Sequence, residues 1–237
     1  MALVVYRESG AAADQRLPSR TFQLGGHVIT LKQEKAETQD CDSLAQVGSV
    51  VWQGAFVLAE YLLRVAPEGS WRGKRVLELG AGTGLAGIAL AQQGARVTLT
   101  DQAHVLPMLR DNVAANSRPP GSSVDGGAGR AEVQELAWGA DSPLHAEGWD
   151  VVIGAECIYQ EECFQPLLAT MQEVCGEGTT AYFSYCHRAR GETKLLAMLK
   201  DAGFRVSHMP LTELHVEYRS GHYHVLKMEK QVPGLCM

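Results

Sequence analysis

Short runs of apolar residues alternate along the chain with stretches whose apolar positions recur at helical spacing. The apolar runs predict strands at 75–79, 96–100, 131–136, 150–154, 179–184, 204–208 and 223–227. The helical spacing predicts helices at 50–63, 85–93, 108–116, 164–174 and 192–202. This alternation is typical of an α/β fold, in which a mostly parallel sheet carries helices on both faces. Because no helix separates the last two strands, we expect an antiparallel edge.

A single domain accounts for the whole chain, 1–237, since no linker divides the pattern. Residues 1–45 are expected to form an N-terminal extension with a short hairpin at 22–32, where apolar residues flank a Gly-Gly pair. Residues 117–130, rich in glycine, serine and proline, are expected to form a surface loop.

Composition narrows the possible functions. The net charge of −6 argues against generic binding to nucleic acid, which depends on cationic neutralisation of phosphates. No apolar stretch approaches the ~20 residues that a membrane span requires, and the first residues lack the apolar core that is typical of a signal peptide. Neither the 6 cysteines nor the histidines show metal-ligand spacing, so no metal is expected. We expect a cytoplasmic monomer, with entry into the nucleus left open.

The strongest local signal is a glycine turn, Gly80-Ala81-Gly82-Thr83-Gly84, directly after an apolar strand. Such glycines let the backbone approach a ligand closely, and the following helix offers its N-terminal amides. Asp101 ends the next strand, where a carboxylate can accept both hydroxyls of a ribose. The pattern therefore predicts a site for a ligand that contains a nucleoside.

Two ligand classes fit this turn. Gly82-x-Gly84-x-x-Gly87 satisfies the dinucleotide pattern of nicotinamide-dependent oxidoreductases. Glu78, inside the strand, would repel a pyrophosphate and suits a cationic amine better. S-adenosylmethionine carries an amine, a sulfonium and a ribose without phosphate, so Glu78 favours the methyl donor.

Several segments together resemble one known family. Residues 76–84 resemble the cofactor motif of the seven-strand methyltransferases, which have a Rossmann-like sheet. Residues 48–52, 136–139 and 155–159 narrow the resemblance to the protein-lysine methyltransferases with an acid-x-x-Tyr motif. Within that family, residues 157–168 and the tail 210–224 are most similar to the members that methylate valosin-containing protein, an AAA ATPase.

The resemblance implies a cofactor site for S-adenosylmethionine, with S-adenosylhomocysteine as the product. Gly80, Ala81 and Gly82 would wrap the methionine part of the cofactor, and Glu78 would lie at its amino group. The partner implied is a protein substrate, such as an AAA ATPase, whose lysine amine accepts the methyl group.

The other cofactor contacts implied come from four separate positions. Asp101 would hold the ribose hydroxyls, and Trp138 would flank the adenine. Trp52 would close over the cofactor from the N-terminal side, and Ala155 would line the floor beneath it. From spacing alone, both tryptophans are equally well explained as core aromatics.

Glu156 and Tyr159 would border the channel through which the target lysine enters, and they are the expected catalytic residues. The chain departs from the family pattern here, because the acid is commonly Asp and Cys186 stands where a Glu is frequent. Besides an oxidoreductase, a methyltransferase fold that acts only as a binding partner or assembly factor stays open, since fold does not establish activity.

Overall fold

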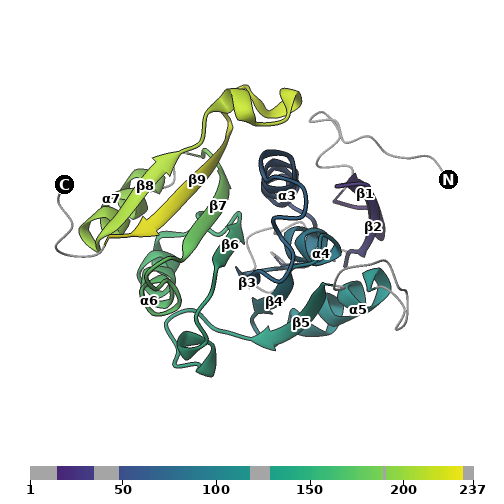
Figure 1. The fold of residues 1–237 in the computed structure, drawn as a ribbon, viewed down its shortest axis with the longest axis horizontal. Coiled ribbons are helices and arrows are strands. Elements are labelled where there is room, and N and C mark those ends of the chain that lie inside the picture. Colours follow the sequence, from purple (N-terminus) through teal and green to yellow (C-terminus); the bar gives the residue numbers. More distant parts are fainter. Residues whose placement is uncertain (1–14, 35–47, 118–128, 189–190, 232–237) are drawn as a thin grey trace.

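A computed structural model describes residues 15–34, 48–117, 129–188 and 191–231, and its main element is a seven-stranded sheet (Figure 1). The strands are β3 (Arg75–Leu79), β4 (Arg96–Asp101), β5 (Arg130–Glu135), β6 (Val151–Ala155), β7 (Thr180–Cys186), β8 (Phe204–His208) and β9 (Tyr223–Lys230). The helices are α3 (Gln53–Val65), α4 (Leu85–Gln92), α5 (Leu106–Asn116), α6 (Phe164–Val174) and α7 (Glu192–Asp201). Every strand and helix predicted from the apolar pattern is confirmed, within a few residues at the ends.

The strands lie in the order β5-β4-β3-β6-β7-β9-β8. All neighbouring pairs from β5 to β7 are parallel, whereas β9 runs antiparallel to both β7 and β8. The expected antiparallel strand is thus present at one end of the sheet, and it is inserted between the two strands that precede it in the chain. The chain reverses direction between β8 and β9 through two short 3₁₀ helices, Leu211–Glu213 and Val216–Tyr218.

Helices cover both faces of the sheet. Helices α3 and α4 lie on one side in Figure 1, and α6 and α7 lie on the other. Each face of the sheet has its own hydrophobic core, and β3 contributes to both because successive side chains of a strand point to opposite faces. Val76 belongs to the core that contains residues of α3 and α4, whereas Leu77 and Leu79 belong to the core that contains residues of α6 and α7. Helix α4 has no polar face because it is buried between the sheet on one side and α3 and the hairpin on the other.

The predicted hairpin is confirmed as β1 (Ser19–Leu24) and β2 (His27–Lys32), which pair antiparallel. Helix α5 packs against β2 of this hairpin. The Asn112 side chain accepts a hydrogen bond from the Lys32 amide at 2.8 Å, and the Asn116 side chain accepts one from the Thr30 amide at 3.0 Å. These side chains occupy backbone groups that a strand edge would otherwise leave exposed.

Parts of the expected N-terminal extension (1–14 and 35–45) and most of the expected surface loop (118–128) lie outside the described residues. Within the part of the chain that the structure describes, none of the helices has the length and apolar character needed to cross a bilayer. The carboxyl ends of β3, β4 and β6 lie next to one another at one edge of the sheet, and the glycine turn, Asp101 and Ala155 are found there.

Candidate functional site

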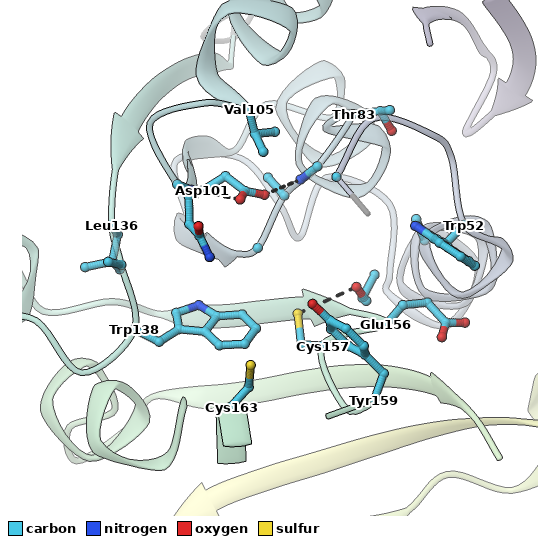
Figure 2. Close-up of a pocket in the computed structure, with 18 of the residues that line it drawn as sticks. Trp52, Thr83, Asp101, Val105, Leu136, Trp138, Glu156, Cys157, Tyr159 and Cys163 are labelled. Atoms are coloured by element: carbon cyan, nitrogen blue, oxygen red, sulfur yellow. Dashed lines mark hydrogen bonds between the residues drawn. The ribbon is translucent and has the colours of Figure 1, made fainter. Parts of the chain in front are cut away.

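A cavity of about 270 Å³ opens at the carboxyl ends of β3, β4 and β6 (Figure 2). Clefts at this end of a parallel sheet are where α/β folds bind ligands, at the point where the strand order reverses. Nine of the ten predicted site residues line it: Trp52, Gly80, Ala81, Gly82, Asp101, Trp138, Ala155, Glu156 and Tyr159. The tenth, Glu78, does not.

The glycine turn forms one wall of the cavity. Gly80 and Gly82 have φ angles of +64° and +53°, a conformation that residues with a Cβ adopt rarely. A Cβ atom on Gly80 would lie 3.0 Å from Cζ2 of Trp138 and 3.1 Å from Sγ of Cys157. Glycine at position 80 therefore keeps the cavity open between the turn and Trp138.

Asp101 connects the end of β4 to the glycine turn. Its carboxylate accepts hydrogen bonds from the amides of Gly82 and Gln102, both at 2.8 Å. Burial raises the pKa of Asp101, and the hydrogen bonds from the two amides act in the opposite direction. The side chain is thereby held in one orientation at the cavity wall.

Trp138 lies across the cavity from Asp101 (Figure 2). It follows β5, and the loop that carries it is tied to α6, because the Thr170 hydroxyl accepts a hydrogen bond from the Gly139 amide at 2.8 Å. Leu136 and Pro166 also line the cavity near this loop. An apolar slot between an aromatic ring and aliphatic side chains suits a flat heterocycle.

Trp52 reaches the cavity from the segment before α3. Side-chain hydrogen bonds place this segment: the Gln33 side chain accepts from the Val51 amide at 2.8 Å, and the Arg20 guanidinium donates to the Val51 carbonyl at 3.1 Å. The predicted helix over 50–63 begins later, at Gln53, and Trp52 directly before it has an extended backbone.

Glu156 directly follows β6 and has a φ angle of +56°, the one positive φ at a non-glycine residue among the described residues. Its side chain is buried, and Oε1 accepts a hydrogen bond from the Gly54 amide at 3.2 Å. Oε2 accepts one from Nη1 of Arg188 at 2.9 Å. Burial raises the pKa of Glu156, and Arg188 opposes that rise.

Tyr159 lies three residues further along, and its hydroxyl is directed toward the cavity (Figure 2). Burial raises the pKa of this phenol to about 12. The hydroxyl is therefore protonated at neutral pH and can both donate and accept a hydrogen bond.

Glu78 lies beneath the glycine turn, with 2% of its surface exposed. Its carboxylate accepts a hydrogen bond from the Gly87 amide, in the first turn of α4, at 3.0 Å. Burial raises its pKa to about 8, and the nearby Asp101 contributes to that rise. The structure thus assigns Glu78 a contact with the helix behind the turn, and its expected contact with a cofactor amine stays a prediction.

Some lining residues were not predicted from the sequence. Gln102, His104 and Val105 follow Asp101, and Cys157 and Cys163 lie on either side of Tyr159. The signal that could have found Gln102 is its position after a strand end, since such residues border the ligand cleft. Arg188 was also missed as a site residue, because it meets Glu156 only through the tertiary structure.

Among the described residues, the aspartate and glutamate side chains that line the cavity are not matched by a lysine or arginine in the lining. These acidic residues are Asp101, Glu156 and Glu162. Such a lining attracts a cationic ligand and repels a pyrophosphate. The described residues also contain no group of three or more histidine, cysteine, aspartate or glutamate side chains arranged to hold a metal ion.

Comparison with known proteins agrees with this geometry. Residues 32–202 match the family described as lysine methyltransferase. The protein N-lysine methyltransferase METTL21A of Mus musculus is 36% identical over 222 residues, which covers 91% of this chain and 94% of the mouse protein. The EEF1A lysine methyltransferase 3 of Mus musculus is 38% identical over 183 residues, or 77% and 72% of the two chains.

Among solved structures, the fold is similar to a TehB-like SAM-dependent methyltransferase from Corynebacterium glutamicum. The TM-score is 0.54 at 19% sequence identity, with 79% of this chain and 92% of the bacterial chain covered. At that identity the likeness supports the Rossmann-like methyltransferase fold and carries no information on the substrate.

Proposed function

The chain belongs to the lysine methyltransferase family, and we propose that it methylates a lysine side chain in an AAA ATPase of the valosin-containing protein type. Family membership and the two protein-lysine methyltransferases above establish the enzyme class, an S-adenosylmethionine-dependent protein-lysine N-methyltransferase. The observation that carries the site assignment is the convergence of nine predicted residues on one acidic cavity.

The residues present fit S-adenosylmethionine. Gly80 leaves a cradle against Trp138 that a Cβ atom would fill. Asp101 presents a carboxylate at the end of β4, where it can accept the two ribose hydroxyls. The acidic lining is complementary to a ligand with a positive sulfonium and a positive amine. The same lining disfavours a nicotinamide dinucleotide, the alternative that the glycine pattern alone left open.

S-adenosylmethionine supplies a methyl group on a positively charged sulfonium, and in one in-line displacement the methyl–nitrogen bond forms as the methyl–sulfur bond breaks. The enzyme must present a neutral lysine amine, although the pKa of a free lysine is about 10.4. Burial of the amine beside Tyr159 lowers its pKa, since desolvation disfavours the ammonium form. The proton is released to water.

Glu156 and Tyr159 are the residues we assign to the acceptor amine. Both line the cavity on the side of Trp52, away from Asp101 and Leu136 (Figure 2). The Tyr159 hydroxyl can accept a hydrogen bond from the amine, and the rings of Tyr159 and Trp52 can contact the lysine stem. Glu156 contributes negative charge, which favours an N–H donor near it.

The substrate proposal depends on a family resemblance. Residues 157–168 and 210–224 resemble the corresponding segments of enzymes that methylate valosin-containing protein. One relative is named for a different substrate, EEF1A, so that protein is the natural competing acceptor. The two proteins therefore belong in one experiment.

The test is transfer of a labelled methyl group from S-adenosylmethionine to purified valosin-containing protein, to purified EEF1A and to a cell extract. We expect label on a lysine of the AAA ATPase, located by mass spectrometry. Asp101→Ala, in which the proposed ribose contact is lost, serves as the inactive control. Label only on EEF1A or on another protein would refute the substrate and keep the enzyme class. No label on any protein, with S-adenosylhomocysteine bound, would favour a role in binding alone.

A further inference from the structure

Arg188 connects the acid of the proposed catalytic pair to the aromatic wall of the cavity. Its Nη1 donates to Oε2 of Glu156 at 2.9 Å, and its guanidinium carbon lies 5.8 Å from the centre of the Trp52 ring. Arg188 follows β7 and does not itself line the cavity, whereas both of its partners do. It therefore acts on the site through other residues.

The Glu156 carboxylate is buried, and the positive charge of Arg188 stabilises its ionised form. Only 8% of the residue is exposed, and a buried carboxylate that lacks a positive partner takes up a proton. The hydrogen bond from the Gly54 amide compensates part of the cost of burial. The titratable groups that act on Glu156 or are affected by it are Arg188 and the thiols of Cys157 and Cys186. Arg188 is the one cation in that set.

The backbone of Arg188 is fixed independently of its side chain. Its amide donates to Oε1 of Glu192 at 2.6 Å. Glu192 is the first residue of α7 and is buried. Oε1 of Glu192 also lies 3.9 Å from Nδ1 of His187. Removing the guanidinium thus takes away the contacts with Glu156 and Trp52 and leaves the anchor of the loop in place.

We propose that Arg188 is a positioning residue for methyl transfer, which holds Glu156 ionised and oriented at the lysine end of the cavity. This proposal rests on the proposed function, because it assumes that Glu156 faces the acceptor amine. The geometry supports it in three ways: the pair is short, the carboxylate is buried, and the same guanidinium lies over Trp52. The strained φ of Glu156 adds to this, because contacts around a strained residue must hold it in place.

The test compares Arg188→Met and Arg188→Lys with a matched control, Arg75→Met. Arg75 pairs with Glu147 at 3.0 Å, and its guanidinium carbon lies 5.2 Å from the centre of the Trp149 ring, at the opposite end of β3 from the cavity. The control thus loses the same kinds of contact away from the site. We expect Arg188→Met to lower kcat roughly tenfold at pH 7, with KM for S-adenosylmethionine unchanged.

The pH dependence separates positioning from general support of the fold. Without Arg188, burial raises the pKa of Glu156 further, so the acid limb of the kcat profile moves to higher pH. Arg188→Lys restores a cation and should return the limb part of the way. An acid limb that stays at the same pH in Arg188→Met, or one that moves equally in Arg75→Met, would overturn the proposal.

A readout that does not depend on activity is the titration of the Glu156 carboxyl carbon by NMR, with Glu156→Gln identifying its signal. The expected result is a titration at higher pH in Arg188→Met than in the unmodified chain. An unchanged titration would refute the ionisation argument. If the chain transferred no methyl group at all, the proposed function would fail, and the NMR result would still decide whether Arg188 controls the charge of Glu156.

Discussion

The carboxylate of Asp101 accepts a hydrogen bond from the backbone amide of Gly82 at 2.8 Å, across 19 positions of sequence. This contact joins the end of β4 to the glycine turn after β3, two features that are separate in the sequence. The turn and the carboxylate are therefore one structural unit. A substitution at Asp101 or at Gly82 should therefore alter the conformation of the other residue.

Asp101→Ala should abolish cofactor binding. The variant loses the proposed acceptor for the ribose hydroxyls and leaves the Gly82 amide without its partner, at a cost of about 1.5–3 kcal/mol for hydrogen bonds to a charged group. Calorimetric titration with S-adenosylhomocysteine measures the affinity. Asp111→Ala removes an exposed aspartate paired with Lys32 and is the control. Unchanged affinity in the Asp101 variant would refute the ribose assignment.

Gly80→Ala should weaken cofactor binding at least about tenfold, or about 1.4 kcal/mol. The new Cβ would lie within 3.1 Å of both Trp138 and Cys157 and would narrow the cavity. Gly69→Ala is the matched control, because Gly69 also has a positive φ, +74°, and nothing lies within 4 Å of its would-be Cβ. Both variants carry the backbone strain, so equal loss of affinity in the two would contradict the cradle.

Tyr159→Phe should leave the affinity for S-adenosylhomocysteine intact and lower kcat roughly tenfold, since it removes only the hydroxyl that we propose to contact the acceptor amine. The pKa of about 12 means that this hydroxyl is protonated through the neutral range, so kcat should show no additional ionisation from it there. Tyr182→Phe, which alters a half-buried tyrosine packed against Tyr61, is the control. Full activity of Tyr159→Phe would remove Tyr159 from the mechanism.

Glu78→Gln should change how stability depends on pH. The pKa of Glu78 is about 8 in the folded chain and 4.5 when exposed, so the folded state keeps a proton that the unfolded state loses. The contribution of Glu78 to stability is thus fully present below pH 4.5 and is lost as pH rises toward 8, by up to about 1.4 kcal/mol per pH unit. Relative to the unmodified chain, the variant should gain stability over that window. Urea unfolding at several pH values measures this, and Glu173→Gln, on the exposed face of α6, should show no such gain.

Glu78 also offers a test of its expected contact with the cofactor amine. A cation near the carboxylate lowers its pKa, so binding of S-adenosylhomocysteine should release a proton from Glu78 at neutral pH. Calorimetry in two buffers with different ionisation enthalpies detects that proton. Release of the same number of protons by the unmodified chain and by Glu78→Gln would place the amine away from Glu78.

The order of helices and strands was decided by the sequence itself. Periodicity of two or of 3.6 reflects which side of an element faces the core, so it survives in the sequence without any knowledge of the partner elements. The glycine turn and Asp101 could also be recognised from the sequence, because tight turns and strand ends impose local requirements on residue type. The family resemblance then supplied residues that local patterns leave ambiguous, such as Trp52 and Trp138.

Only the tertiary structure decided what meets at the cavity. The contact of Glu156 with Arg188 joins residues 32 positions apart, and the contact with Gly54 spans 102. The Glu78 side chain contacts α4, because β3 places it beneath the glycine turn. The position of Glu78 in the sequence does not reveal this direction. Strand β9 entered between β7 and β8 because strand order depends on pairing between distant segments. Periodicity records whether a residue is buried, and the identity of its distant neighbours depends on how the layers pack.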